Sequence, residues 1–464
     1  MPLRDIFIVG AVIVLAVLAL RRPWIGVMNW TWLSIMNPHR YTWGFAYNAP
    51  LAQIAAGSTL IALLFTKDRH SPFQGAPTWW LLVFIGWITL SWLFGFDPEA
   101  DYWDWDRAMK IYMMTFVALA LLHNKHQLMA FAWVTVGSLA LLAAKGGLFT
   151  VLTGGSHRVW GPATSFISDN NHFAAATIVV IPMLHFLQLQ LRPGWQRHLM
   201  SVVMLLCAAA AIGSHSRGAF LALAAMGAVF WWRSPRKGMI ALVAIVFLLA
   251  FLPIMPEQWW DRMHSIKDYE EDASAMGRIN AWLVALEVAK HNFFGGGMTY
   301  QHEVYFVAYG VYETTVRAAH SIYFQILGNH GFGGLFLYLM IWVSTLLSAG
   351  RLRILAREHE KAKWAGDLAS MVQVSLISYA VGGAFLSIPY FDLPYNLMVL
   401  VVLARKWVES RAWETEPDMS FLEYAGFRKR KRSTTKRPDE PTAAGNFSGM
   451  DRSTVNKETK LPGV

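Results

Sequence analysis

Three short stretches of this sequence place arginine or histidine among glycine and other small residues. Arg217 lies in Ser-His-Ser-Arg-Gly (214–218), and Arg278 lies in Met-Gly-Arg-Ile-Asn-Ala-Trp (276–282). The planar guanidinium of arginine can bind phosphate through two parallel hydrogen bonds. His320, in Ala-His-Ser-Ile-Tyr (319–323), could act as a general base or position an acceptor hydroxyl. Together these residues predict binding of an anionic, lipid-linked substrate.

Each of the three residues also has a structural interpretation that the sequence leaves open. An arginine at a membrane boundary, such as Arg217, often only reaches toward lipid headgroups. Arg278 is expected near a helix N-terminus, in a helical stretch 278–291, where free amides favour anions. It could instead pair with the acidic run 268–272 just before it. A lone histidine is more often structural than catalytic.

Other familiar catalytic patterns are absent from the sequence. His302-Glu303 lacks a second histidine four residues after the first, which excludes a zincin-type zinc site. There is no P-loop and no Gly-x-Ser-x-Gly motif. The single cysteine, Cys207, lies in an apolar run and excludes a disulfide within the chain or a cysteine metal site. We therefore expect neither a cofactor nor a metal, and we interpret Asp104-Trp105-Asp106 as interfacial charge.

The elements that must position these residues are long apolar helices. Of 464 residues, 55% are hydrophobic and only 15% are charged, more apolar than a soluble domain tolerates. Stretches such as 78–96 and 173–191 reach the length of about 20 residues that a bilayer core of about 30 Å requires. The apolar segment 6–20 is expected to be a retained first helix, because no small-residue cleavage site follows it. The predicted fold is an all-α integral membrane protein with about 12–13 transmembrane helices.

Lysine and arginine cluster in alternate connections, which indicates the orientation of the chain. The basic connections are 67–70, 123–126, 192–198, 233–237 and 351–363. By the positive-inside rule they are cytoplasmic, as is the C-terminal tail with its basic run 428–432. We interpret that run as an orientation anchor rather than a nucleic-acid patch. The connections 97–106, 146–170, 213–217, 254–320 and 388–394 then face outward; the side of the N-terminus stays open.

This topology divides the chain into four predicted parts. It also places a second group of polar residues on the outer side. The parts are N-terminal transmembrane helices (1–253), a large periplasmic catalytic loop (254–320), C-terminal transmembrane helices (321–408) and a disordered basic cytoplasmic tail (409–464). The added candidates for substrate binding are Lys145, Arg158, Asn171 and His172, with Asn170 beside them. The turn 168–172 could equally serve only to cap the following helix. Tyr390 and Asp392 are weaker candidates.

The order of these motifs resembles a known family. Ser-Arg-Gly, then Gly-Arg with Trp and Ala-Leu, then Phe-Gly-Gly-Gly, then a histidine opening a glycine-rich span resembles the O-antigen ligase and polymerase superfamily. It is most similar to the O-glycosylation ligases associated with exosortase systems. The resemblance covers about residues 1–408, with its specific motifs in 160–335. The family usually has asparagine after the loop histidine, where this chain has Ser321.

The resemblance implies a bacterial inner-membrane glycosyltransferase that works at the periplasmic face without a metal. The implied donor is a glycan linked to undecaprenyl diphosphate, and the acceptor is a hydroxyl on lipid A core, a protein or another glycan. Arg217 and Arg278 match the family's diphosphate-binding arginines, and His320 matches its proposed catalytic histidine. Transfer would proceed with inversion, with membrane lipids but no nucleic acid as further partners.

Two alternatives remain open from the sequence. A polymerase of the same superfamily, which joins repeat units, would use the same arginines and loop. A polytopic transporter or flippase is the alternative of a different class. Transporters usually carry ionisable residues in the middle of their spans, whereas Arg217 and His320 are expected near span ends.

Overall fold

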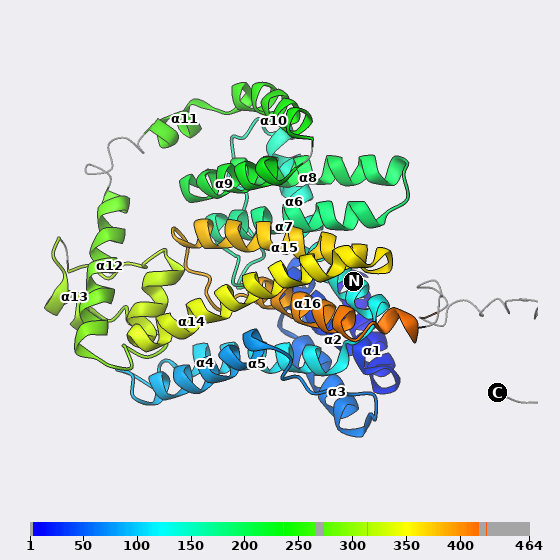
Figure 1. Ribbon diagram of the computed structural model, residues 1–464. Helices are drawn as coiled ribbons and strands as arrows, with labels where there is room; N and C mark the ends of the chain where they lie inside the picture. The colour runs from blue at the N-terminus through cyan, green and yellow to red at the C-terminus, as the bar shows by residue number, and fades with distance from the viewer. Residues whose placement is uncertain (1–2, 235, 265–272, 313, 417–423, 425–464) are drawn as a thin grey trace, which may run out of the picture. The chain divides into compact units, whose positions relative to one another are not determined.

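The computed structural model describes residues 3–234, 236–264, 273–312, 314–416 and 424, and within them the regular structure is helical, without strands (Figure 1). The described helices belong to a compact unit that extends to Pro417. In chain order the α-helices are α1 (Leu3–Arg21), α2 (Pro23–Met36), α3 (Leu51–Phe65), α4 (Ala76–Leu93), α5 (Tyr102–Leu121), α6 (Lys125–Leu152), α7 (Asn170–Gln190), α8 (Trp195–Gly213), α9 (Arg217–Arg233), α10 (Lys237–Phe251), α11 (Glu257–His264), α12 (Ala273–His291), α13 (Glu303–Tyr309), α14 (Ile322–Leu355), α15 (Lys363–Gly383) and α16 (Asp392–Glu409).

Seven of the described helices are long and apolar enough to cross a membrane, which confirms the predicted all-α integral membrane protein. They are α1, α4, α6, α7, α8, α10 with its extension to Ile254, and α14 with its extension to Glu358. The predicted total of 12–13 is larger because it includes helices that are short or carry charge. For example, α2 has only 14 residues, and the first half of α5 contains Asp104, Asp106, Arg107 and Lys110.

The surface of α10 illustrates why lipid is the solvent of this fold. Of the 15 residues of α10, only Phe251 is buried, and the side chain of Leu249 is 72% exposed. An apolar helix with such an exposed surface is unfavourable in water but suits hydrocarbon, where every backbone hydrogen bond is satisfied within the helix.

The centre of the helical packing is α7, whose side chains from Phe173 to Leu187 are almost all buried. Helices α6, α8, α9 and α15 pack against it, and Figure 1 shows α7 beside α15. The alanines at 174–176 allow close approach of the neighbouring backbones, as is usual between membrane helices. The N-terminus of α7 is thereby held in the middle of one end of the bundle.

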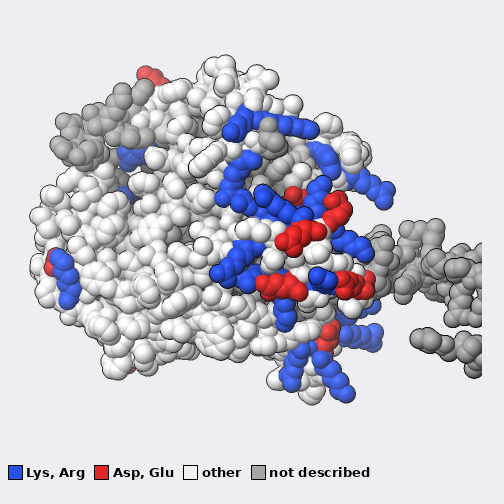
Figure 2. Space-filling view, in the orientation of Figure 1, with Lys and Arg blue, Asp and Glu red and all other residues white. Residues whose placement is uncertain are grey.

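The two ends of the bundle differ in what they carry. Helices α11, α12 and α13 lie beyond one end, at the left of Figure 1. Charged side chains gather toward the opposite end, at the right of the same view in Figure 2. Two basic stretches contribute to that end: 192–198, which includes part of the α7–α8 connection, and 351–363, which includes the α14–α15 connection. The acidic run 268–272 and the basic tail from residue 417 lie outside the described residues, apart from Tyr424.

Candidate active site

The helix that carries Arg278 packs against the segment that carries His320. Helix α12 buries Ala281, Val284 and Ala285 against Tyr300 and Phe306. It begins at Ala273, five residues before Arg278, so it starts earlier than predicted. Arg278 therefore lies in the second turn, and the free amides of the helix N-terminus do not account for its place in the site. Its position is instead fixed by the packing of α12.

Trp282, one turn beyond Arg278 on α12, holds the residue before the histidine. Its indole Nε1 donates to the backbone carbonyl of Ala319 at 2.7 Å. Its ring also stacks on Phe324, in the first turn of α14, with ring centroids 5.0 Å apart and planes 7° from parallel. The tryptophan of the Arg278 motif thus fixes both sides of His320 relative to α12.

His320 occupies an unusual backbone conformation at the entry to α14. Its φ of 45° lies in the left-handed region, which is costly for a residue other than glycine and is often found at functional sites. The imidazole is partly buried, and its Nδ1 accepts no hydrogen bond from any described residue. Burial lowers the pKa of His320 to about 4, assisted by the positive charges of Arg278 and His172 and opposed by Asp169. A neutral imidazole at neutral pH can accept a proton.

The groups around His320 on α7 are positioned by a helix cap. Asp169 is the N-cap residue, and its Oδ1 accepts the backbone N–H of Asn171 at 2.8 Å and that of His172 at 3.4 Å. Burial acts to raise the pKa of Asp169, but these hydrogen bonds and the nearby His172 outweigh it and lower the pKa. The turn 168–172 therefore caps α7, as one interpretation predicted, and also faces His320. Asp169 itself was missed, although an aspartate before Asn-Asn-His is a recognisable N-cap signal.

Arg217 reaches the same region through the N-terminus of α7. The side-chain Nδ2 of Asn170 donates to the carbonyl of Ser214 at 2.6 Å, which joins α7 to the turn before α9. Arg217 is the first residue of α9, and Ser216 caps that helix by accepting the N–H of Ala219 at 3.2 Å. At Gly218 a Cβ atom would lie 2.7 Å from Cβ of Phe385, so this glycine is required for close packing with the end of α15.

Two arginine motifs and a neutral histidine thus meet around the start of α7, at the end of the bundle that bears α11–α13. Residues 202–339, which contain Arg217, Arg278 and His320, match the O-antigen ligase family (Wzy_C), and residues 3–192 match a family of unknown function (DUF5935). The chain carries an O-antigen ligase domain. The superfamily predicted from the motifs is thereby confirmed. A comparison with curated proteins found no match.

The O-antigen ligase domain indicates the general activity of the protein. It has a membrane glycan-processing role of the ligase or polymerase type and is a glycosyltransferase-like enzyme. Such a role implies, in general terms, a lipid-linked glycan as donor and a glycan or lipid as acceptor. Its transmembrane helices make it a multi-pass membrane protein.

Two further predicted site residues, Arg158 and Lys145, lie in the N-terminal half of the chain, outside the matched ligase domain. Arg158 is exposed, but the N–H of its neighbour Val159 donates to the carbonyl of Gly213 at 3.3 Å, beside the Arg217 turn. Lys145 is exposed on α6, with its Nζ 5.4 Å from the ring centroid of Tyr41. Among the described contacts none brings Lys145 to His320. The site roles predicted for both residues stay predictions.

Arg107, which the sequence motifs do not mark, lies beside Phe166 in the segment before α7. The guanidinium of Arg107, on α5, lies 3.6 Å from the ring centroid of Phe166, whose backbone interacts electrostatically with His172. Its charge interacts with those of Asp392 and Asp104. Asp392, a weaker candidate from the sequence, is buried at the start of α16. Only the position of Arg107 directly after the predicted outer connection 97–106 could have marked it in advance.

The glycine-rich turn 294–297 is fastened to the ligase domain by buried polar residues. The N–H groups of Gly296 and Gly297 donate to the carbonyls of Gly328 and Asn329 at 2.8 and 3.0 Å. His330, fully buried, has Nδ1 2.7 Å from Ser91 Oγ and Nε2 2.6 Å from the hydroxyl of Tyr390. Tyr390 thus belongs to the buried hydrogen-bond network that joins α4, α14 and the turn. The structure brings together the segments that carry five of the predicted site residues: Arg217, Arg278, His320, Asn171 and His172. Their roles in the site remain hypotheses.

Proposed function

We propose that the protein transfers a glycan from undecaprenyl diphosphate to an acceptor hydroxyl at the periplasmic face, with inversion and without a metal. The acceptor class comprises lipid A core, a protein or another glycan. The observation that carries the proposal is the position of His320, which the hydrogen bond from Trp282 to Ala319 holds against the helix of Arg278. Burial at this position lowers the pKa of the imidazole. The catalytic segment is proposed to be 254–320, together with the ends of α7, α9 and α14.

The proposed reaction is a single displacement at the anomeric carbon. The acceptor oxygen bonds to that carbon while the bond from the carbon to the diphosphate oxygen breaks, and undecaprenyl diphosphate leaves. The acceptor proton passes to His320, acting as general base. Negative charge grows on the leaving diphosphate, where the guanidinium groups of Arg278 and Arg217 are suited to stabilise it.

Donor binding would also make His320 a better base. The positive charge of Arg278 is, after burial, the largest cause that lowers the pKa of His320. A bound diphosphate would neutralise that charge and add negative charge close to the imidazole. The pKa of His320 should then rise toward neutrality when the donor is in place. The histidine would thus be free of a proton before donor binding and a stronger acceptor after it.

The charge distribution supports the proposed orientation. Helices α11–α13 lie at one end of the bundle, and the charged side chains gather at the other (Figures 1 and 2). By the positive-inside rule the basic end faces the cytoplasm. The site would therefore open to the periplasm, with the C-terminus on the cytoplasmic side of the inner membrane.

Glycan transfer in vitro tests the proposal. Purified wild type, His320→Ala and His291→Ala would be given an undecaprenyl-diphosphate-linked glycan and an acceptor, with a chelator present throughout. His291 is the matched control because it is exposed on α12, the helix that carries Arg278. Chelator-resistant transfer by wild type and His291→Ala, lost in His320→Ala, would support the proposal. Equal transfer by wild type and His320→Ala would overturn the role of His320, and loss of wild-type transfer on chelation that metal restores would overturn metal independence.

The length of the product separates ligase from polymerase. A ligase moves a preassembled glycan onto the acceptor in one step, so the product should carry the donor's full length. A polymerase would instead extend the lipid-linked chain by repeat units. Gel analysis of the lipid-linked pool and of the acceptor after the same reaction distinguishes these outcomes.

A further inference from the structure

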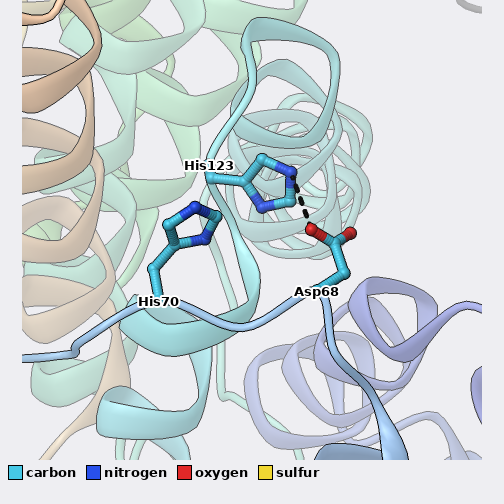
Figure 3. A group of neighbouring side chains, drawn as sticks. All are labelled: Asp68, His70 and His123. Carbon is cyan, nitrogen blue, oxygen red and sulfur yellow. Dashed lines mark ion pairs between the residues drawn. The ribbon is translucent and has the colours of Figure 1, made fainter.

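A cluster of metal-ligand side chains lies outside the proposed active site. Asp68 and His70 come from the connection between α3 and α4, and His123 comes from the connection between α5 and α6. Figure 3 shows the three side chains pointing toward one another from these two segments. One ligand atom from each lies within 4.8 Å of the others. Among the described residues it is the one such group of histidine, cysteine and carboxylate side chains.

The spacing within the cluster suits a shared metal ion. Nε2 of His123 lies 3.4 Å from Oδ1 of Asp68. Two donors bound to the same tetrahedral zinc ion, each about 2.0–2.1 Å from it, are about 3.3–3.4 Å apart. The His70 ring has its centroid 4.7 Å from that of His123, and a side-chain rotation would bring its ligand nitrogen closer to complete the set. Its exposure leaves room for that rotation and for a water molecule as fourth ligand.

The backbones that carry the three ligands are already held together. The N–H of His70 donates to the carbonyl of Ala120, at the end of α5, at 2.9 Å. The N–H of His123 donates to Oε1 of Gln127 at 2.8 Å, and Gln127 takes part in the capping box that starts α6. A metal would therefore bind without ordering a long loop, which lowers the entropic cost of binding.

One of the cations that flank the cluster in the sequence is engaged by a backbone carbonyl. Arg69 lies between the two ligands of the first segment, but its Nη1 points to the carbonyl of Leu63 at 3.4 Å. Two neutral imidazoles and one carboxylate give a net charge of −1, which suits a divalent cation. Imidazole nitrogens favour zinc and its neighbours among the transition metals over magnesium or calcium, which prefer oxygen.

We propose that Asp68, His70 and His123 bind a divalent transition metal ion of the zinc class, which joins the α3–α4 and α5–α6 connections. This site is separate from the proposed glycosyl transfer. Asp101, at the start of α5, contacts the outer segment, whereas His123 follows the other end of that 20-residue helix. The two ends are about 30 Å apart at 1.5 Å per residue. Metal binding here and metal-independent transfer at the other end are compatible.

Zinc titration of the full-length protein tests this proposal. The protein would be purified in detergent with an affinity tag that contains no histidine, stripped with a chelator, and titrated against a zinc-binding dye. Wild type is expected to bind one zinc ion per chain. The His70→Ala/His123→Ala double variant should lose that ion, with an affinity at least about 100-fold weaker. His126→Ala is the matched control, because His126 lies in the first turn of α6 beside the cluster but outside it.

Cobalt spectroscopy and thermal unfolding provide readouts that do not depend on enzyme activity. Cobalt in place of zinc should give the intense visible absorption of a tetrahedral ion in wild type and in His126→Ala only. Zinc should raise the Tm of these two proteins and leave that of the double variant unchanged, because a ligand that binds only the folded state stabilises it. If the metal-free double variant unfolds early, the exposed single variant His70→Ala replaces it. Equal zinc binding by wild type and the variants that lack these histidines would overturn the proposal.

Discussion

The carboxylate of Asp101 accepts the backbone N–H of Met298 at 2.6 Å, across 197 residues of sequence. The same Oδ2 atom accepts the N–H of Thr299 at 3.1 Å. Asp101 is the N-cap residue of α5 and is only 3% exposed, so these bonds join α5 to the turn between α12 and α13 inside the protein. One buried carboxylate therefore helps to hold the outer segment against the membrane helices.

Replacement of Asp101 by alanine should loosen this connection. Hydrogen bonds to a charged acceptor contribute about 1.5–3 kcal/mol each, so the loss of two should cost about 3 kcal/mol or more and lower the Tm by several degrees. Asp101→Asn should retain much of the stability, because one amide oxygen can still accept both N–H groups. Thermal unfolding in detergent measures both variants. An alanine variant as stable as wild type would show that the contact is not needed.

The kink in α14 should be intolerant of any side chain. Gly331 has φ 66° and ψ −174°, a conformation that only glycine adopts readily, and a Cβ there would lie 2.4 Å from the carbonyl oxygen of Phe293. Gly331→Ala should therefore reduce the yield of folded protein and its Tm. Gly86→Ala on α4 is the control, because its Cβ would meet no atom within 4 Å. Size-exclusion profiles and Tm values that match for the two variants would contradict this explanation of the kink.

The sequence predicted the membrane helices because their signal is local. An apolar run long enough to span a bilayer is visible without knowledge of its neighbours, as in the run that became α7. The motif around Arg278 was found for a similar reason, as a compact pattern of residue types. Its interpretation as a helix N-terminus failed because α12 extends back to Ala273, five residues before Arg278.

The contacts that build the site were beyond prediction because they are distant in sequence. Nothing in one sequence pairs Trp282 with Ala319, Asn170 with Ser214 or Arg107 with Phe166. The metal-ligand cluster was not predicted for the same reason, since His70 and His123 lie 53 positions apart in the sequence. Such pairs follow from helix packing, which fixes their neighbours only after the whole bundle has assembled.

At each of the two arginines, replacement by alanine should reduce transfer more than replacement by lysine. Arg278→Ala and Arg217→Ala should each lower the rate of transfer by at least about 100-fold, the scale of loss when a group that stabilises developing charge is removed. Lysine should restore only part of the rate, because an ammonium group lacks the planar fork that binds phosphate twice. The measurement is kcat/KM with a lipid-linked donor, on protein with wild-type Tm. A fully active Arg278→Ala variant would remove that residue from the site.

Comparison of His330 with His320 should distinguish a structural histidine from a catalytic one. It is fully buried between Ser91 and Tyr390 and has no exposed atom with which to reach a substrate. His330→Ala should leave two buried partners without their hydrogen bond and lower the Tm strongly, at a cost of about 2–4 kcal/mol. His320→Ala should abolish transfer with little change in Tm. Parallel measurement of Tm and transfer tests both, and a stable but inactive His330→Ala variant would contradict the structural role.

The dependence of transfer on pH should reveal how the donor changes His320. In the free protein burial, Arg278 and His172 lower the pKa of His320 from its ordinary value of 6.5 to about 4, against the opposing effect of Asp169. Since kcat/KM reports the free enzyme, its acidic limb should lie near pH 4, well below that of an ordinary histidine. The free energy of unfolding should also decrease as the pH falls from 6.5 to 4, because only the unfolded chain takes up this proton in that range.

The value of kcat reports the complex with the donor, so its acidic limb should lie at higher pH than that of kcat/KM. The reason is that a bound diphosphate cancels the charge of Arg278 and favours the protonated imidazole. Steady-state rates between pH 4 and pH 8, with saturating and with limiting donor, give the two limbs. Arg278→Lys, which retains the charge, should preserve the separation between them if enough activity remains. Limbs that coincide near pH 6.5 would show that His320 is not the base, or that Arg278 does not act on it.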